Sequence, residues 1–271
     1  MHELAADAGT CFTRNAGKHL AGRVRANRPV VAQWWIAFSA GPGRAEDIYV
    51  VKADGTGLRQ VTSDPAADFD PTQSPDGKQI AYRHQIGDDR STDIYVVDAD
   101  GSGERNVSRN EGVADWGPAW SPDGSQIAFM AQTPEGTQNY EIFVMNADGT
   151  DPRRLTQSPG DDGWPTWSPD GRRILFSSVR DDCSVSDAPD CKTTGDIGPY
   201  HTLYVMNADR SAQVRLTDAF GQIADWCPDG HYVVFEDLEG RDGLSLIRSD
   251  GSGLTTLPLD LSSPGFPDWI P

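Results

Sequence analysis

Aspartate is the residue type with the most chemistry to offer in this sequence. The 271-residue chain holds 33 Asp, and its 41 Asp+Glu against 23 Lys+Arg give a formal net charge of -18 at pH 7. Carboxylates can bind a cation, act in acid–base catalysis or attract a basic partner. Asp also closes tight turns by bonding to its own backbone. The position of each Asp relative to the turns therefore decides whether it is available for chemistry.

The acids in two recurring turn phrases are predicted to be structural. Ser-Pro-Asp-Gly ends at Gly77, Gly124 and Gly171, spaced by 47 residues, and Cys227 replaces the serine in a fourth copy. A catalytic serine is needed only once, so a recurring phrase indicates a hairpin. The segment Asp98–Glu104 resembles the start of an EF-hand loop, but it lacks the third acidic ligand. It is also predicted to be a hairpin.

The histidines give no catalytic or metal-binding pattern. No pair has the spacing of metal ligands among His2, His19, His84, His201 and His231. A glycosidase needs two carboxylates beside its sugar, and 33 Asp residues do not single out a pair. The sequence therefore nominates no catalytic residue, no metal ligand and no resident cofactor, although a cation such as Ca²⁺ among the acids stays open.

Short strands are the elements that must position these acids. Each turn phrase is followed by an apolar run such as Ile127–Phe129, a longer run such as Glu141–Met145 and a final run such as Arg154–Thr156. Four short β-branched and aromatic runs per unit of about 45 residues are typical of a β-propeller blade. The pattern predicts an all-β propeller of five four-stranded blades over residues 36–271. Pro267–Ile270 is expected to close the ring by pairing with the blade that begins at Ile36.

The repeated phrase resembles the WD-like (PD40-type) repeat of TolB-type propellers. The resemblance rests on Trp120-Ser-Pro-Asp-Gly124, Ile127-Ala-Phe129, the Asn146-Ala-Asp-Gly-Thr150 turn and Arg154-Leu-Thr156. It implies a propeller that binds partner proteins at the mouth of its channel. TolB itself has six blades after a separate α/β domain, so six blades are the alternative to five.

The acids that the turns do not explain precede or begin each first strand. In a propeller these connections converge on one mouth of the channel, where carboxylates would create a negative potential and tryptophans could anchor a partner. The predicted partner- or ligand-binding residues are Asp68, Asp70, Asp115, Trp116, Asp161, Asp162, Trp164, Asp225 and Asp268. The alternative is a surface that serves solubility only.

The remaining features bound the partners and the compartment. Residues 1–35 form a basic segment with no apolar core and are predicted to be a flexible arm. The acidic remainder argues against nucleic acid as a partner, and no apolar run is long enough to span a bilayer. Cys183 and Cys191 are candidates for a small-loop disulfide, with a reduced pair as the alternative, and Cys227 is predicted to be a buried small residue. The compartment is undetermined: cytoplasmic by default, or periplasmic or extracellular for a truncated TolB-like protein.

These observations favour a monomeric, non-enzymatic binding module for a basic protein or peptide. The enzymatic alternatives are a glycan lyase or hydrolase, or the gating propeller of a prolyl-oligopeptidase-like peptidase. The chain contains no Gly-x-Ser-x-Gly phrase, so a hydrolase of the latter kind would need its catalytic domain elsewhere.

Overall fold

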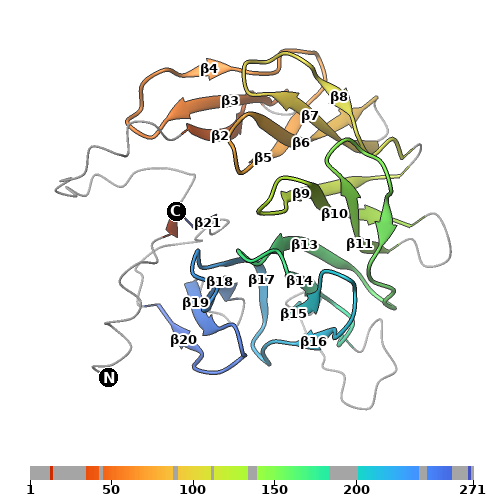
Figure 1. Ribbon diagram of the computed structural model, residues 1–271, viewed down its shortest axis with the longest axis vertical. Helices are drawn as coiled ribbons and strands as arrows, with labels where there is room; N and C mark the ends of the chain where they lie inside the picture. Colours follow the sequence, from red (N-terminus) through yellow and green to blue (C-terminus); the bar gives the residue numbers. More distant parts are fainter. Residues whose placement is uncertain are drawn as a thin grey trace. The chain divides into compact units, whose positions relative to one another are not determined.

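The computed structural model describes residues 13–14, 35–42, 45–87, 91–110, 113–133, 139–182, 201–237, 243–257 and 268–269. These ranges contain strands and turns but no helix (Figure 1). The chain divides into two compact units, one of residues His19–Gln157 and one of Met1–Lys18 with Ser158–Pro271. Cys183 and Cys191 lie outside the described residues.

The unit His19–Gln157 contains three antiparallel sheets in which each strand pairs with the next in the chain. The first sheet is β2 (Trp35–Ala40), β3 (Asp47–Lys52) and β4 (Arg59–Gln60). The second is β5 (Asp68–Gln73), β6 (Gln79–Ile86), β7 (Ser91–Asp98) and β8 (Arg105–Asn106). The third is β9 (Asp115–Trp120), β10 (Gln126–Gln132), β11 (Tyr140–Asn146) and β12 (Arg153–Arg154).

The other unit contains two sheets of the same kind and one short ribbon. One sheet is β13 (Asp162–Trp167), β14 (Arg173–Ser178), β15 (Thr202–Asn207) and β16 (Val214–Arg215). The next is β17 (Gly221–Trp226), β18 (Tyr232–Asp237), β19 (Gly243–Arg248) and β20 (Thr255–Thr256). The ribbon pairs β1 (Thr13–Arg14) with β21 (Asp268–Trp269).

The prediction of an all-β chain with five antiparallel blades is confirmed, with one correction at the ends of the chain. The C-terminal segment was expected to pair with the blade that begins at Ile36, but the described partner of β21 is β1. The first sheet accordingly has three strands among the described residues. A strand needs backbone partners along its edge, and here the basic N-terminal segment supplies them for β21.

The core lies between consecutive blades of each unit. Trp120 at the end of β9 packs with Ala81 and Ile94 of the preceding blade, and its Nε1 donates to the Thr72 carbonyl at 3.2 Å. Trp226 at the end of β17 packs against Leu175 of the preceding blade. Trp120, Trp167 and Trp226 occupy the same register position in their repeats and are all buried; the Trp269 side chain lies outside the described residues.

The recurring turn phrases are hairpins, as predicted. In the first copy the Ser74 hydroxyl donates to Asp76 and also accepts a bond from the Gln79 backbone N–H. Hydrogen bonds from Ser74 and the Lys78 backbone hold the pKa of Asp76 down at about 2. In the segment that resembled an EF-hand loop, Asp100 accepts bonds from the N–H and hydroxyl of Ser102. These carboxylates therefore accept hydrogen bonds within their own turns.

Each first strand of the four complete blades bends at its third residue. Asp70, Gly117, Trp164 and Ile223 have positive φ angles of 52°, 57°, 54° and 48°, and the pairing register shifts beside each of them. A left-handed residue in a bulge re-aims the neighbouring side chains and is costly for a residue with a Cβ. The bend therefore sets the direction in which the side chains of the first two residues of each first strand point.

The turn between the third and fourth strands of a sheet contains a glycine, and at Gly149 this glycine allows two blades to approach closely. A Cβ added at Gly149 would lie 2.4 Å from the Val107 carbonyl oxygen of the preceding blade, whereas one added at Gly55 would meet nothing within 4 Å. Both glycines have similar positive φ, 86° and 82°.

Replacing Gly149 with Ala is therefore expected to destabilise the chain more than replacing Gly55. Gly55→Ala carries only the backbone cost of about 1 kcal/mol, and Gly149→Ala adds about 2 kcal/mol for the clash between blades. Urea unfolding of both variants measures the difference. Equal losses would show that the blades separate easily at this contact.

Candidate functional site

The first residue of the first strand is an aspartate in three blades. Asp68, Asp115 and Asp162 begin β5, β9 and β13, and all three side chains are fully buried. The equivalent residue of β17 is Gly221, where an added Cβ would lie 2.4 Å from the Phe235 ring. A buried carboxylate needs hydrogen-bonding or charged partners, so the partners in each blade decide what this position can do.

Asp162 has a charged partner. Its Oδ2 lies 2.6 Å from Nη2 of Arg180, and its Oδ1 accepts a bond from the Ser178 hydroxyl at 2.5 Å. The Arg180 guanidinium also lies 4.5 Å from the centre of the Tyr204 ring. This aspartate is part of a buried ion pair that organises its blade.

The partners of Asp115 are neutral among the residues that the structure describes. Nδ2 of Asn110 lies 3.0 Å from each of its carboxylate oxygens. Burial raises the pKa of Asp115 to about 7, although bonds from Ser108 and Asn110 lower it, and the nearby charge of Asp93 raises it further. The group therefore titrates near neutral pH.

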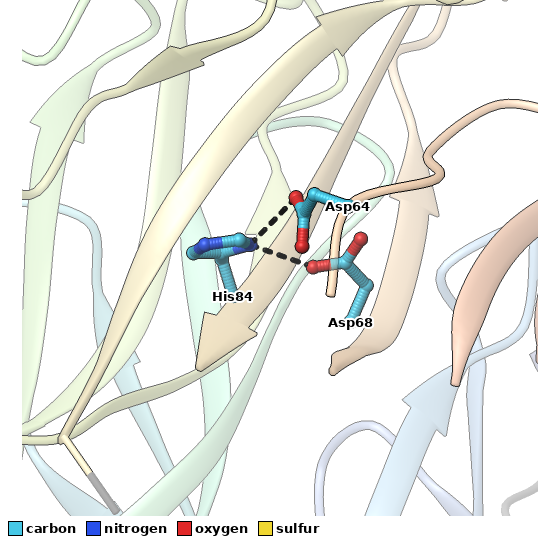
Figure 2. Close-up of side chains that lie close together, drawn as sticks. All are labelled: Asp64, Asp68 and His84. Atoms are coloured by element: carbon cyan, nitrogen blue, oxygen red, sulfur yellow. Dashed lines mark hydrogen bonds and ion pairs between the residues drawn. The ribbon is translucent and has the colours of Figure 1, made fainter. Parts of the chain in front are cut away.

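Asp68 has a histidine as its partner. Nδ1 of His84, on β6, lies 2.8 Å from Oδ1 of Asp68 and 3.7 Å from Oδ2 of Asp64, which precedes β5 (Figure 2). The other oxygen of Asp64 accepts a bond from the Ala66 N–H at 2.7 Å, which orients its carboxylate. One ligand atom from each of these three residues lies within 4.8 Å of the others. We call Asp64, Asp68 and His84 the His84 cluster.

The charges in the His84 cluster depend on one another. Burial disfavours the imidazolium, but the hydrogen bond that His84 donates to Asp68 and the charges of Asp68 and Asp64 outweigh it and raise the pKa of His84. Burial also raises the pKa of Asp68, which the bond to His84 lowers in part. His84 and Asp68 together therefore keep a proton up to a higher pH than a free imidazole does. The ring of Tyr95 covers the imidazole, with centroids 4.3 Å apart.

A second group lies on the opposite face of the same strands. The Arg83 guanidinium lies 4.4 Å from the centre of the Phe69 ring and 4.2 Å from that of Trp116, and its Nε is 3.0 Å from Oδ2 of Asp70. Arginine between two rings and beside a carboxylate is held by cation–π attraction and charge together. Asp70 and Trp116, both predicted from the sequence, are brought together by an arginine that the sequence did not single out.

Four partly exposed acids lie within or close to these two groups in the unit His19–Gln157. Glu46, Asp47, Asp64 and Asp70 are neither buried nor fully exposed. Burial and the charge of Asp64 raise the pKa of Asp47, with a bond from Gln60 opposing them. Burial also raises the pKa of Asp70, which Arg83 lowers and Glu46 raises. We call these four residues the acidic patch.

The other predicted site residues lie in the second unit. Asp161 is exposed, Trp164 and Asp225 are half-buried, and the Asp268 side chain lies outside the described residues. Cys227 is buried, as predicted, but it is also disulfide-bonded, which was not expected. Its partner cysteine lies outside the described residues.

Strand register is the signal that would have found His84. Residues 16 positions apart face each other across the first two strands, so His84 lies opposite Asp68 and Ser178 lies opposite Asp162. The cluster has no closely spaced sequence motif because its members come from a loop and two strands.

Comparison with known proteins shows that the chain is similar to TolB in sequence and in fold. The family model "TolB beta propeller domain" (PD40) matches residues 88–184. The Tol-Pal system protein TolB of Anaeromyxobacter dehalogenans (strain 2CP-C) is 51% identical over 37 residues, which are 14% of this chain and 8% of that protein. The chain thus spans only a small part of this curated relative.

Two solved structures show the fold. TolB from Acinetobacter baumannii matches with a TM-score of 0.66 and 22% identity, over 86% of this chain and 55% of that chain. A putative TolB from Agrobacterium tumefaciens matches with a TM-score of 0.63 and 24% identity, over 83% of each chain. The fold is therefore a β-propeller. No helix among the described residues is long and apolar enough to cross a membrane.

Proposed function

Because the chain is a TolB-like β-propeller repeat protein, we propose that it is a binding module for a protein or peptide with basic side chains. The observation that supports this most is the acidic patch. Its carboxylates are partly open to solvent. Burial raises the pKa of Asp47 and Asp70 most, and repulsion from Asp64 and from Glu46, respectively, adds to the shift, while Arg83 opposes it at Asp70. Ligand lysines or arginines would relieve that repulsion.

The contacts of Arg83 support the same proposal, because they show how this chain holds one of its own basic side chains. The Arg83 guanidinium is held by Phe69, Trp116 and Asp70, and Asp70 is itself a member of the acidic patch. The same combination of ring and carboxylate is what a binding site for a basic side chain uses. The relative named as a Tol-Pal system protein bears the name of an assembly, in line with a binding role.

The residues predicted in the other unit stay predicted binding residues of that unit. They are Asp161, which is exposed, Trp164 and Asp225, which are half-buried, and Asp268. Asp115 and Asp162 are fully buried, so they would not contact a partner directly. The disulfide at Cys227 favours an oxidising compartment, in which secreted and periplasmic proteins meet their partners.

Removing two patch charges is expected to weaken binding of a basic ligand. The double variant Glu46→Gln/Asp47→Asn leaves the His84 cluster and Arg83 in place. Each exposed charge contributes up to about 1 kcal/mol, so the double variant should bind a Lys/Arg-rich peptide about five- to tenfold more weakly at low salt. Fluorescence anisotropy with a labelled peptide measures the change.

The matched control is Asp54→Asn/Asp151→Asn, which removes the same charge from two exposed turn residues. It should bind the peptide as the unmodified chain does. If the patch variant and the control bind equally, net charge alone accounts for the affinity and the acidic patch is not the site.

An enzymatic role is the second candidate, and the His84–Asp68 pair is the observation that favours it. A carboxylate that orients an imidazole is the arrangement of a general base. A glycan lyase or hydrolase would lose turnover of its polysaccharide in His84→Gln, whereas a pure binding module would show no turnover in either form.

A further inference from the structure

We propose that Asp64, Asp68 and His84 form a binding site for a divalent cation of the zinc class. Two carboxylates and one imidazole meet where the connection from β4 enters β5 and passes the end of β6 (Figure 2). All three residues belong to the unit His19–Gln157, so the site is complete within one unit. It is separate from the acidic patch proposal except for Asp64, which the two share.

The distances between the donor atoms fit a small ion. Two donors on a tetrahedral zinc ion with bonds of about 2.0–2.1 Å are separated by about 3.4 Å. Nδ1 of His84 is 2.8 Å from the Asp68 oxygen and 3.7 Å from the Asp64 oxygen, which bracket that separation. Shifts of about half an ångström would seat an ion, which would replace the proton now between Nδ1 and Asp68.

An unpartnered buried oxygen is the independent observation that points to a ligand. Asp68 is 0% exposed, and its Oδ2 has no hydrogen-bond partner. The hydroxyl of Thr62 lies near enough to lower the pKa of Asp68, but no hydrogen bond to Oδ2 forms. Leaving a buried carboxylate oxygen without a partner is costly, and a cation bound by both oxygens of the Asp68 carboxylate would remove that cost.

The donor set selects the class of ion. Calcium and magnesium prefer oxygen ligands throughout, whereas imidazole nitrogen with carboxylate oxygen suits zinc and its neighbours in the first transition row. Three protein ligands are the number found in zinc sites that keep an open fourth position. That position would take water or a donor atom of a bound partner.

The cluster is pre-arranged and accessible. The bond from the Ala66 N–H fixes one oxygen of Asp64 and leaves the other facing His84. The Asp64 side chain is 34% exposed, so an ion can enter past it, while His84 is covered by Tyr95. Fixed ligand orientation of this kind raises metal affinity because little order has to be created on binding.

Zinc titration of the full chain tests the site. After removal of metals with a chelator, isothermal titration with ZnCl₂ should show one site per chain, with Ca²⁺ binding at least tenfold more weakly. Asp64→Asn should lower the zinc affinity at least tenfold. Asn keeps an oxygen for the Ala66 N–H, so this variant is expected to fold, which its circular dichroism spectrum checks.

The control is Asp151→Asn, which removes an exposed carboxylate far from the cluster in sequence and should bind zinc normally. His84→Gln should abolish the site as a second ligand change. The proposal is overturned if the unmodified chain binds no zinc, if Asp64→Asn binds it equally, or if calcium binds more tightly than zinc.

Discussion

Replacing Asp115, whose side chain is fully buried, with Asn is expected to stabilise the protein above neutral pH. The carboxyl of Asp115 is 0% exposed and its partners are neutral. No positive group among the described residues compensates the desolvation of its ionised form, and burial raises its pKa to about 7. Above that pH the folded chain holds an unfavourable buried charge, which an amide does not carry.

The direction of the pH dependence follows from the proton balance. The folded-state pKa of about 7 lies above the ordinary value of 3.8, so between these values the folded chain binds more protons than the unfolded one. Stability therefore falls as the pH rises from about 4 to about 7 and stays low above it. Three units correspond to an upper limit of about 4 kcal/mol. Imperfect bonding of the new amide to Asn110 lowers the net gain to about 2 kcal/mol.

Urea unfolding of both forms between pH 5 and pH 8.5 measures this effect. The variant should match the unmodified chain at pH 5 and exceed it by about 2 kcal/mol at pH 8. The other titrating groups cancel in the difference between the two curves. Asp151→Asn, at an exposed position, should show no such pH-dependent gain. A difference that does not change with pH would mean that Asp115 is ionised without cost.

The repeat made the blades predictable, and the tryptophan register shows why. Trp120, Trp167 and Trp226 recur at one place in a phrase bounded by Pro-Asp-Gly turns, so period and turn chemistry agree on the strands. The pairing of β21 with β1 was not predictable. Two-residue strands carry too little pattern, and their partners are far apart in the chain.

The candidate site was predictable only in part, because a repeat hides the differences between its copies. Asp68 and Asp115 were expected at an exposed mouth, yet both are buried at the same position of successive blades. What distinguishes them is the residue opposite, His84 in one blade and Ala131 in the next. That information lies in the cross-strand register and becomes available only when the strand bounds and the bulge are known.

Asp162 is expected to respond to the same substitution in the opposite direction. Its carboxylate accepts bonds from Arg180 and Ser178, so in this blade the buried charge is compensated. Asn at this position would turn an amide N–H₂ or a single oxygen toward the guanidinium and leave Arg180 without its counter-ion. Breaking one side of a buried ion pair costs about 3–5 kcal/mol. Arg180 is 18% exposed and also reaches Gln213, which reduces the expected loss to about 2–4 kcal/mol.

Unfolding by urea at pH 7 measures the loss for Asp162→Asn. The control in the same unit is Asp229→Asn, where the new oxygen still accepts the bond from the His231 N–H, so little change is expected. The double variant Asp162→Asn/Arg180→Met should recover part of the loss, because it removes the unpaired charge and keeps the contact with Tyr204. If Asp162→Asn is as stable as the unmodified chain, the guanidinium is fully solvated and the ion pair does not organise the blade. Opposite signs at Asp115 and Asp162 would establish that cross-strand partners determine what each copy of this aspartate does.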